Sequence, residues 1–357
     1  MKELVIISGK GGTGKTSVTA SFAVLAGRPV IADCDVDAPD LHLVLSPRIN
    51  ERHEFRSGHE AIIREEDCIG CGVCLANCRF GAVRMDRMAA AEASVLSPEL
   101  GDKFSRALRP AGKARRPRIV GLFEARGPAR SAGRESLKGA TPPDGMPRPE
   151  NVGAFRTQDT RFSIDPVACE GCGVCVRFCP EKAIDFPERL CGEWMISETR
   201  CGPMVHARLG VAAENSGKLV STVRREARRI ADEEHRSLVI VDGPPGIGCP
   251  VIASVTGATL VLTVTEPTVS GEHDLERVLS LTRHFNILTA ICVNKWDLNP
   301  EMTERIEDKA RRAGVRVVGR IRYDREVTLA QMQERAVVET EAPCVEDVQG
   351  IWKQLGL

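Results

Sequence analysis

Eight of the fourteen cysteines are the residues whose type and spacing indicate chemistry most directly. They form two runs with the same spacing, C-x2-C-x2-C-x3-C, at residues 68–78 and 169–179. Thiolates spaced this closely can enclose one face of an iron–sulfur cubane. Structural zinc is the alternative, but C-x2-C-x2-C is not the usual spacing of zinc ligands. The runs therefore favour iron–sulfur clusters as cofactors.

The two runs resemble those of bacterial two-cluster ferredoxins, in which the fourth cysteine of each run binds the other cluster. Pro180 follows the second run as in those proteins, whereas Arg79 replaces the proline after the first. The resemblance implies two [4Fe–4S] clusters with complementary ligand sets. These sets are Cys68, Cys71, Cys74 and Cys179 for one cluster, and Cys169, Cys172, Cys175 and Cys78 for the other.

A second motif, GKGGTGKT at residues 9–16, matches the phosphate-binding pattern G-x-x-x-x-G-K-[ST] between an apolar run and a helical one. Its backbone N–H groups and the following helix N-terminus attract phosphate oxygens. We expect Lys15 to neutralise the β- and γ-phosphates and Thr16 to bind Mg²⁺. The predicted nucleotide-binding residues here are Gly9, Lys10, Gly11, Gly12, Thr13, Gly14, Lys15, Thr16 and Ser17.

Lys10, directly after the first glycine, makes this loop resemble the deviant Walker A signature of the MinD/ParA/Mrp ATPases. In that group the signature lysine reaches the nucleotide of the partner subunit, so the resemblance implies a homodimer with nucleotide at its interface. The run DCDVDAPD (33–40) resembles the first switch of the group, and VIVDGPPGIG (239–248) resembles its Walker B strand and second switch. By this match Asp35 positions or activates the attacking water. The implied catalytic residues are Lys10, Lys15, Asp35 and Asp242, and the implied Mg²⁺ ligands are Thr16, Asp35 and Asp242.

The run NKWD (294–297) bears on which base is bound. An asparagine at this place touches the base in the ATPase group, whereas Asn-Lys-x-Asp reads guanine in GTPases. We expect Asn294, Lys295 and Asp297 near the nucleotide. The deviant Walker A signature favours ATP over GTP, and Asp297 then only caps the next helix.

Cys249 and Cys201 are further candidate ligands. Cys249 follows Asp242 by seven residues, a relation that resembles the cysteine of the nitrogenase iron protein that holds a cluster shared between subunits. Such a bridge needs a second cysteine, for which Cys201 is the candidate, and a buried cysteine at a helix start is the simpler interpretation. The other cysteines are interpreted as core or surface residues: Cys34, Cys191, Cys292 and Cys344.

These residues must be positioned by an α/β scaffold. Short apolar runs predict strands, and amphipathic segments between the later ones predict helices, which together indicate a mostly parallel, doubly wound sheet of a P-loop NTPase. The predicted strands span residues 3–9, 29–33, 237–243, 258–265, 288–294 and 314–321. The predicted helices span residues 16–26, 271–284, 301–313 and 326–336.

The middle of the chain breaks this alternation. We predict an ATPase domain at 1–58 and 188–357, interrupted by an α+β two-cluster ferredoxin domain at 59–86 and 159–187. Residues 87–158 are rich in Pro, Gly, Ala and Arg and carry seven excess positive charges. This composition cannot bury much apolar surface, so we expect a disordered insertion. A basic tail for nucleic acid or a partner is the weaker alternative, because aromatic residues are scarce.

Bulk properties restrict the class of protein. The 357 residues carry no net charge, which gives no argument for a nucleic-acid or anionic-membrane partner. A strand expected from residue 3 leaves no room for a signal peptide, and no apolar run is long enough to span a bilayer. We therefore expect a cytoplasmic protein with reduced cysteines.

The leading functional hypothesis is an ATP-hydrolysing dimer in which nucleotide gates electron transfer from the ferredoxin module to an unidentified redox or iron–sulfur client protein. The alternative is a cluster or metal assembly carrier resembling Mrp and CooC. A MinD-like spatial organiser would need a membrane-binding C-terminal helix. The stripe there has one basic neighbour, Lys353, and is interrupted by Gly350, so docking on the sheet is favoured for Val348, Ile351, Trp352 and Leu355.

Overall fold

The computed structural model describes residues 1–87, 160–210, 213 and 216–357. The chain divides into two compact units, residues 1–60 with 187–357 and residues 61–186. The basic insertion predicted at 87–158 lies outside the described residues, apart from residue 87.

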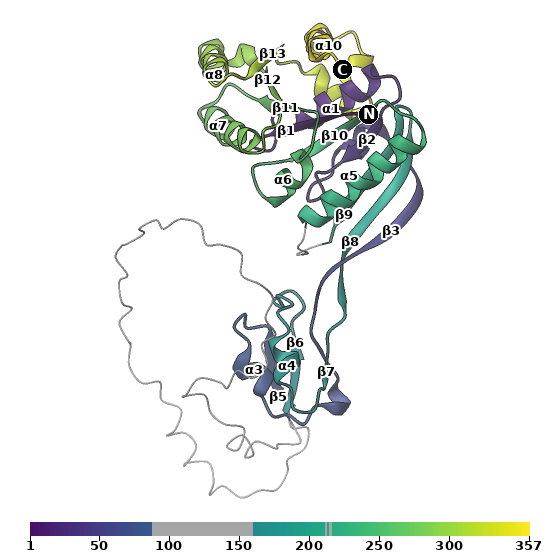
Figure 1. Ribbon diagram of the computed structural model, residues 1–357, viewed down its shortest axis with the longest axis vertical. Coiled ribbons are helices and arrows are strands. Elements are labelled where there is room, and N and C mark those ends of the chain that lie inside the picture. The colour runs from purple at the N-terminus through teal and green to yellow at the C-terminus, as the bar shows by residue number, and fades with distance from the viewer. Residues whose placement is uncertain (88–159, 211–212, 214–215) are drawn as a thin grey trace, which may run out of the picture. The chain divides into compact units, whose positions relative to one another are not determined.

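The larger unit is built on one sheet (Figure 1). In the described part of the chain its nine strands have the order β13-β12-β11-β1-β10-β2-β9-β8-β3. The strands from β13 to β9 run parallel, and β8 and β3 complete the sheet in antiparallel pairing. Their bounds are β1 (Lys2–Ser8), β2 (Val30–Asp33), β3 (Arg48–His59), β8 (Glu188–Thr199), β9 (Gly202–Leu209), β10 (Leu238–Pro245), β11 (Leu260–Thr265), β12 (Thr289–Asn294) and β13 (Arg316–Ile321).

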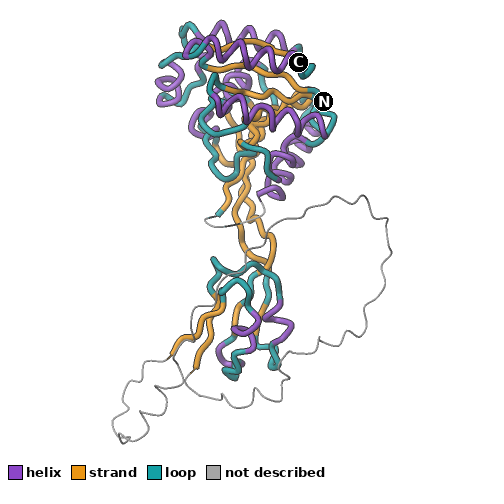
Figure 2. Tube along the Cα trace, turned by 90° about the vertical axis from the view of Figure 1, so that its left-hand side faces the viewer, coloured by secondary structure: helices purple, strands orange, loops and turns teal. Residues whose placement is uncertain are grey.

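Helices cover both faces of this sheet, as Figure 2 shows. Alternate residues of a strand point to opposite faces, so Leu4 and Ile6 of β1 pack with α1 and α10, while Val5 and Ile7 pack with α5 and α6. The helices are α1 (Lys15–Leu25), α2 (Leu41–Leu45), α5 (Ser216–Glu233), α6 (Cys249–Val255), α7 (Val269–His284), α8 (Pro300–Arg312), α9 (Glu326–Met332) and α10 (Cys344–Leu355), with short 3₁₀ turns η4 (Trp296–Leu298) and η5 (Val337–Glu339).

The predicted α/β architecture with a mostly parallel sheet is confirmed. All six predicted strands are present, as β1, β2, β10, β11, β12 and β13. Three strands of this nine-stranded sheet were not predicted, namely β3, β8 and β9. The helix predicted over 326–336 ends earlier, at Met332, because Glu334 adopts a left-handed conformation with φ of 56°.

The C-terminal helix α10 docks on the sheet, as favoured above. Val348, Ile351 and Leu355 are buried in the core, and the ring of Trp352 lies 5.1 Å from that of Phe22. Its apolar stripe is therefore covered by the protein. Within the described residues, no helix combines the length and hydrophobicity needed to cross a bilayer.

The smaller unit contains two similar halves (Figure 1). Each half has a five-residue helix, α3 (Val73–Asn77) or α4 (Val174–Phe178), that follows a left-handed glycine, Gly72 or Gly173, with φ of 70°. Short antiparallel strands pair the halves. These strands are β4 (Ile62–Ile63) with β7 (Ile184–Asp185), and β5 (Val83–Arg87) with β6 (Thr160–Ile164), and a 3₁₀ turn, η1 (Glu65–Asp67), precedes the first cysteine.

Candidate functional site: a phosphate-loop cavity and two cysteine-lined cavities

The phosphate loop connects the end of β1 to the start of α1 and borders a cavity of about 450 Å³. Gly12 and Gly14 have φ of 79° and 89°, which favours glycine. A Cβ atom at Gly14 would also lie 2.3 Å from the side-chain amide nitrogen of Asn294. The loop lies at the carboxyl edge of the parallel strands, the usual ligand-binding edge of such sheets.

Lys15 is the buried centre of a cluster of charges. Its Nζ lies 3.2 Å from an Asp35 carboxylate oxygen and 3.0 Å from one of Asp242. Burial opposes the charge of Lys15, but Asp242, Asp35 and Asp33 outweigh it and raise the lysine pKa. The structure thus brings the predicted residues of the loop, the first switch and the Walker B strand together.

Thr16 and Asp242 form the polar edge of this cluster. The Thr16 hydroxyl donates to one Asp242 carboxylate oxygen at 2.8 Å, and the Thr19 hydroxyl donates to the other at 2.9 Å. A hydroxyl beside a carboxylate is a set of oxygen donors that suits Mg²⁺. These residues fit the predicted metal, and Asp35, the third predicted Mg²⁺ ligand, contacts the same Lys15 ammonium group as Asp242.

Asp33, at the end of β2, belongs to the same cluster and was not predicted. Its side chain is fully buried, and its Oδ2 has no hydrogen-bond partner among the described residues. Burial and the nearby Asp242 carboxylate raise the pKa of Asp33 well above its usual range. Its position as the last residue of a buried strand, two residues before Asp35, was the available signal.

Lys10 does not point at the other loop residues. Its ammonium group pairs with Glu266, the residue after β11, and donates to the Ser270 hydroxyl at 3.0 Å. The Lys295 ammonium group also lies 3.5 Å from a carboxylate oxygen of Glu266, and it donates to the carbonyl of Gly12 at 3.2 Å. Glu266 was not predicted, because a carboxylate after a strand carries no distinctive spacing.

The NKWD residues divide between two places. Asn294 donates to the carbonyl of Thr13 at 2.8 Å, and both Asn294 and Lys295 line the cavity. Asp297 does not line the cavity, and its carboxylate accepts the backbone N–H of Tyr323 at 2.7 Å. The cavity wall beyond the loop was missed by sequence reasoning and includes Ile321, Arg322, Tyr323, Asp324, Val327, Thr328 and Gln331.

The eight cysteines of the two runs line two small cavities in the described part of the smaller unit. One cavity is bordered by Cys68, Cys71, Cys74 and Cys179, and the other by Cys78, Cys169, Cys172 and Cys175. In each cavity the fourth cysteine comes from the other run. Among the described residues, no three His, Cys, Asp or Glu side chains approach closely enough to hold a single metal ion.

Backbone amides approach some of these sulfur atoms. The N–H of Ala183 donates to Cys179 Sγ at 3.3 Å. Burial opposes ionisation of Cys78, but the backbone N–H groups of residues 80–83 together outweigh it and lower the pKa of its thiol. Burial instead raises the pKa of the Cys74 thiol to about 11.

Cys249 and Cys201 are not brought together. Cys249 is exposed at the start of α6, after the carboxyl end of β10. Cys201 is buried before the start of β9, whose Met204 pairs with Ile31 of β2. Because β2, β9 and β10 are parallel, Cys249 lies beyond the carboxyl ends of these strands and Cys201 lies at their amino ends. Cys34, Cys191, Cys292 and Cys344 are buried.

Comparison with known proteins gives the following matches. The family described as "CobQ/CobB/MinD/ParA nucleotide binding domain" matches residues 4–337. An uncharacterised protein of Methanocaldococcus jannaschii, MJ0578, is 29% identical over 303 residues, which cover 83% of this chain and 79% of that protein. The cell division ATPase MinD of Pyrococcus furiosus is 14% identical with a TM-score of 0.49, covering 99% of this chain and 98% of that one. A ParA family ATPase of Chlorobium tepidum is also 14% identical with a TM-score of 0.45, and the match covers 100% of this chain and 99% of that one.

Proposed function

Because the chain belongs to the CobQ/CobB/MinD/ParA family of nucleotide-binding domains, we propose that it binds and hydrolyses ATP with Mg²⁺ as a homodimer. We further propose that its smaller unit is a two-cluster ferredoxin domain, and that the nucleotide state controls electron transfer from that domain to a client protein. The observation that carries the second part is the division of the eight cysteines between two cavities, each bordered by three from one run and one from the other.

The charge cluster around Lys15 supports the hydrolytic part. Lys15 now contacts Asp35 and Asp242, and it would exchange these carboxylates for phosphate oxygens when nucleotide binds. Thr16 and Asp242 would hold Mg²⁺, which neutralises phosphate charge. Asp35, released from Lys15, would then orient the attacking water as a hydrogen-bond acceptor.

The position of Asp297 supports ATP over GTP. Guanine readout by an Asn-Lys-x-Asp motif requires the aspartate to accept from the base, but the Asp297 carboxylate accepts from the Tyr323 backbone and lies outside the cavity lining. Asn294 remains beside the loop, where the ATPase resemblance expects it.

The complementary cysteine sets support two [4Fe–4S] clusters. A cubane is larger than a single ion, so its four thiolates surround a cavity rather than one point, which agrees with the arrangement seen. Each set combines three cysteines around a short helix, α3 or α4, with one from the other half. When bound, the clusters would supply one-electron redox chemistry.

The test is anaerobic reconstitution followed by iron, sulfide and EPR analysis. We expect about eight irons per chain. The crossed ligand sets make a sharper prediction: Cys179→Ser should perturb the same EPR signal as Cys71→Ser, whereas Cys78→Ser should perturb the signal changed by Cys172→Ser. Stoichiometric zinc without iron–sulfur absorbance would contradict the proposal.

Cluster transfer separates the two functional candidates. A gated ferredoxin domain should keep its clusters when mixed with an apo-ferredoxin acceptor and ATP. Rapid nucleotide-dependent loss of iron to that acceptor would favour the assembly-carrier alternative instead.

A further inference from the structure

Arg200 lies in the tight turn between β8 and β9, on an element that sequence reasoning did not predict. The turn is firmly positioned: the Thr199 hydroxyl donates to the carbonyl of Gly202 at 2.8 Å and accepts the N–H of Cys201 at 3.1 Å. Gly202 has φ of 128°, and a Cβ atom there would lie 2.5 Å from the carbonyl oxygen of Pro29. The turn therefore cannot shift easily against β2.

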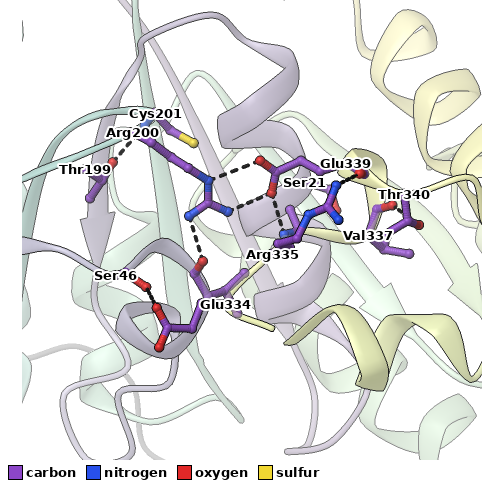
Figure 3. A network of polar contacts seen from close by, with 12 residues as sticks. Ser21, Ser46, Thr199, Arg200, Cys201, Glu334, Arg335, Val337, Glu339 and Thr340 are labelled. Atoms are coloured by element: carbon purple, nitrogen blue, oxygen red, sulfur yellow. Dashed lines mark hydrogen bonds and ion pairs between the residues drawn. The ribbon is translucent and has the colours of Figure 1, made fainter. Parts of the chain in front are cut away.

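The guanidinium of Arg200 joins two other segments (Figure 3). Its Nη1 donates to the carbonyl of Val44, near the end of α2, at 2.9 Å. Its Nε and Nη2 donate to the two carboxylate oxygens of Glu339, in η5, at 3.1 and 2.7 Å. Glu339 also accepts the backbone N–H of Ala336 at 2.7 Å, which fixes the start of η5.

Both of these segments continue into walls of the nucleotide cavity. Asp35, Ala38 and Asp40, which precede α2, line one wall, and Val337 of η5 lines another. A second contact joins the same walls, between the Ser46 hydroxyl after α2 and the Glu334 carboxylate. Arg200 itself does not line the cavity, so any effect on nucleotide must act through the walls.

We propose that Arg200 is a positioning residue for the nucleotide: it holds the α2 and η5 walls at a fixed spacing from the β8–β9 turn, so that nucleotide binding and the order of this turn depend on each other. The inference rests on the proposed nucleotide binding at the phosphate loop. It identifies a route by which the first switch acts on β8, the strand that follows the smaller unit in the chain.

The geometry requires arginine. A planar guanidinium can donate to a carboxylate through two nitrogens while a third reaches a carbonyl, whereas an ammonium group offers no such fork. Arg200→Lys should therefore behave like Arg200→Ala. Glu339→Gln keeps an acceptor for Ala336 but removes the charge, so it provides a second, milder variant that should still fold.

Arg28→Ala is the matched control. Arg28 lies in the turn after α1, and its guanidinium is 3.2 Å from a carboxylate oxygen of Glu198 in β8. This ion pair therefore involves the same strand as the Arg200 turn but neither α2 nor η5. Loss of this exposed pair should leave nucleotide binding unchanged.

The first measurement is the affinity of each full-length variant for a fluorescent ADP analogue with Mg²⁺. We expect Arg200→Ala, Arg200→Lys and Glu339→Gln to bind about fivefold or more weakly, with kcat for ATP close to wild type, because Lys15, Asp35 and Asp242 are untouched. Wild-type affinity in both Arg200 variants would overturn the inference. A fall in kcat alone, with unchanged affinity, would also overturn it.

The second measurement is amide hydrogen exchange, which a merely structural role would not couple to nucleotide. In the wild type and in Arg28→Ala, ADP should slow exchange over residues 197–204. In Arg200→Ala this nucleotide-dependent protection should disappear, and its persistence would overturn the inference. Failure of the wild type to bind nucleotide would overturn the proposed function as well, whereas normal binding by Arg200→Ala counts against this inference alone.

Discussion

At the scale of single residues, the nucleotide cavity places three carboxyl groups around a single ammonium group. Asp33, Asp35 and Asp242 surround one cation, Lys15, and Asp33 is fully buried. A buried carboxylate without full hydrogen bonding is costly. Sites of this kind commonly reduce stability in exchange for function.

We therefore expect Asp33→Asn to raise the free energy of unfolding of the nucleotide-free protein by about 1–2 kcal/mol and to weaken Mg²⁺-dependent nucleotide binding. Thermal denaturation and a Mg²⁺ titration of nucleotide binding measure the two effects. Asp37→Asn, an exposed carboxylate in the same run, is the control and should change neither. A destabilised Asp33→Asn protein would show that the carboxylate is needed for the fold.

Lys10 carries the prediction for dimerisation. Its ammonium group is paired with Glu266 within the same chain, so engaging a partner subunit requires breaking that pair. Glu266→Gln should strengthen ATP-dependent dimerisation, whereas Lys10→Ala should keep ATP binding but impair dimerisation and hydrolysis.

Size-exclusion chromatography with ATP reports the dimer, and the double variant tests the mechanism. In a Lys10→Ala background, Glu266→Gln should have no further effect, because the cation that it restrains is gone. Asp274→Asn, a carboxylate near Gly9, controls for a general change of charge near the loop. A gain from Glu266→Gln that persists without Lys10 would refute a role for the pair.

At the scale of elements, periodicity predicted the strands that are buried on both faces. The runs around Val5, Val241 and Val261 are continuously apolar because helices cover both sides of the sheet. β3 and β8 lack this signal: β3 is mostly exposed and charged, and it pairs with a strand more than a hundred residues away. Local sequence cannot predict such a pairing. Spacing along the chain also could not reveal that Cys201 and Cys249 lie at opposite ends of the parallel strands.

The helix α10 gives a direct test of whether its apolar stripe serves the core. Ile351 is buried, and its side chain occupies the space that a Cβ atom at Gly319 would need. Ile351→Ala should lower the free energy of unfolding by about 2–4 kcal/mol, as measured by urea denaturation, while the exposed Lys353→Ala should have little effect. Wild-type protein should not sediment with anionic vesicles. The membrane alternative would be restored if the wild type did sediment and if Ile351→Ala abolished this binding without lowering the free energy of unfolding.

At the scale of the whole molecule, the cysteine-bearing unit is inserted in the sequence of the nucleotide-binding unit, between β3 and β8. The connection into the smaller unit passes from Asp35 through α2 into β3, and the return passes through β8 into β9, which pairs with β2. Both connections are therefore hydrogen-bonded strands of the sheet that carries the first switch. A smaller unit that acted independently would need no such arrangement, and this is the structural argument for the proposed coupling between nucleotide and clusters.

Coupling of this kind is reciprocal, and a typical coupling energy of about 1–3 kcal/mol corresponds to tens of millivolts for one electron. Redox titrations of the reconstituted protein without nucleotide, with ADP and with a non-hydrolysable ATP analogue should therefore give midpoint potentials that differ by tens of millivolts. Lys15→Ala, which should bind no nucleotide, is the control and should show one potential in all three conditions. Limited proteolysis near Glu188, at the start of β8, should change with nucleotide in the wild type alone. If potentials and cleavage are the same in every state, the clusters are not gated by nucleotide, and the smaller unit serves as a docking or storage site.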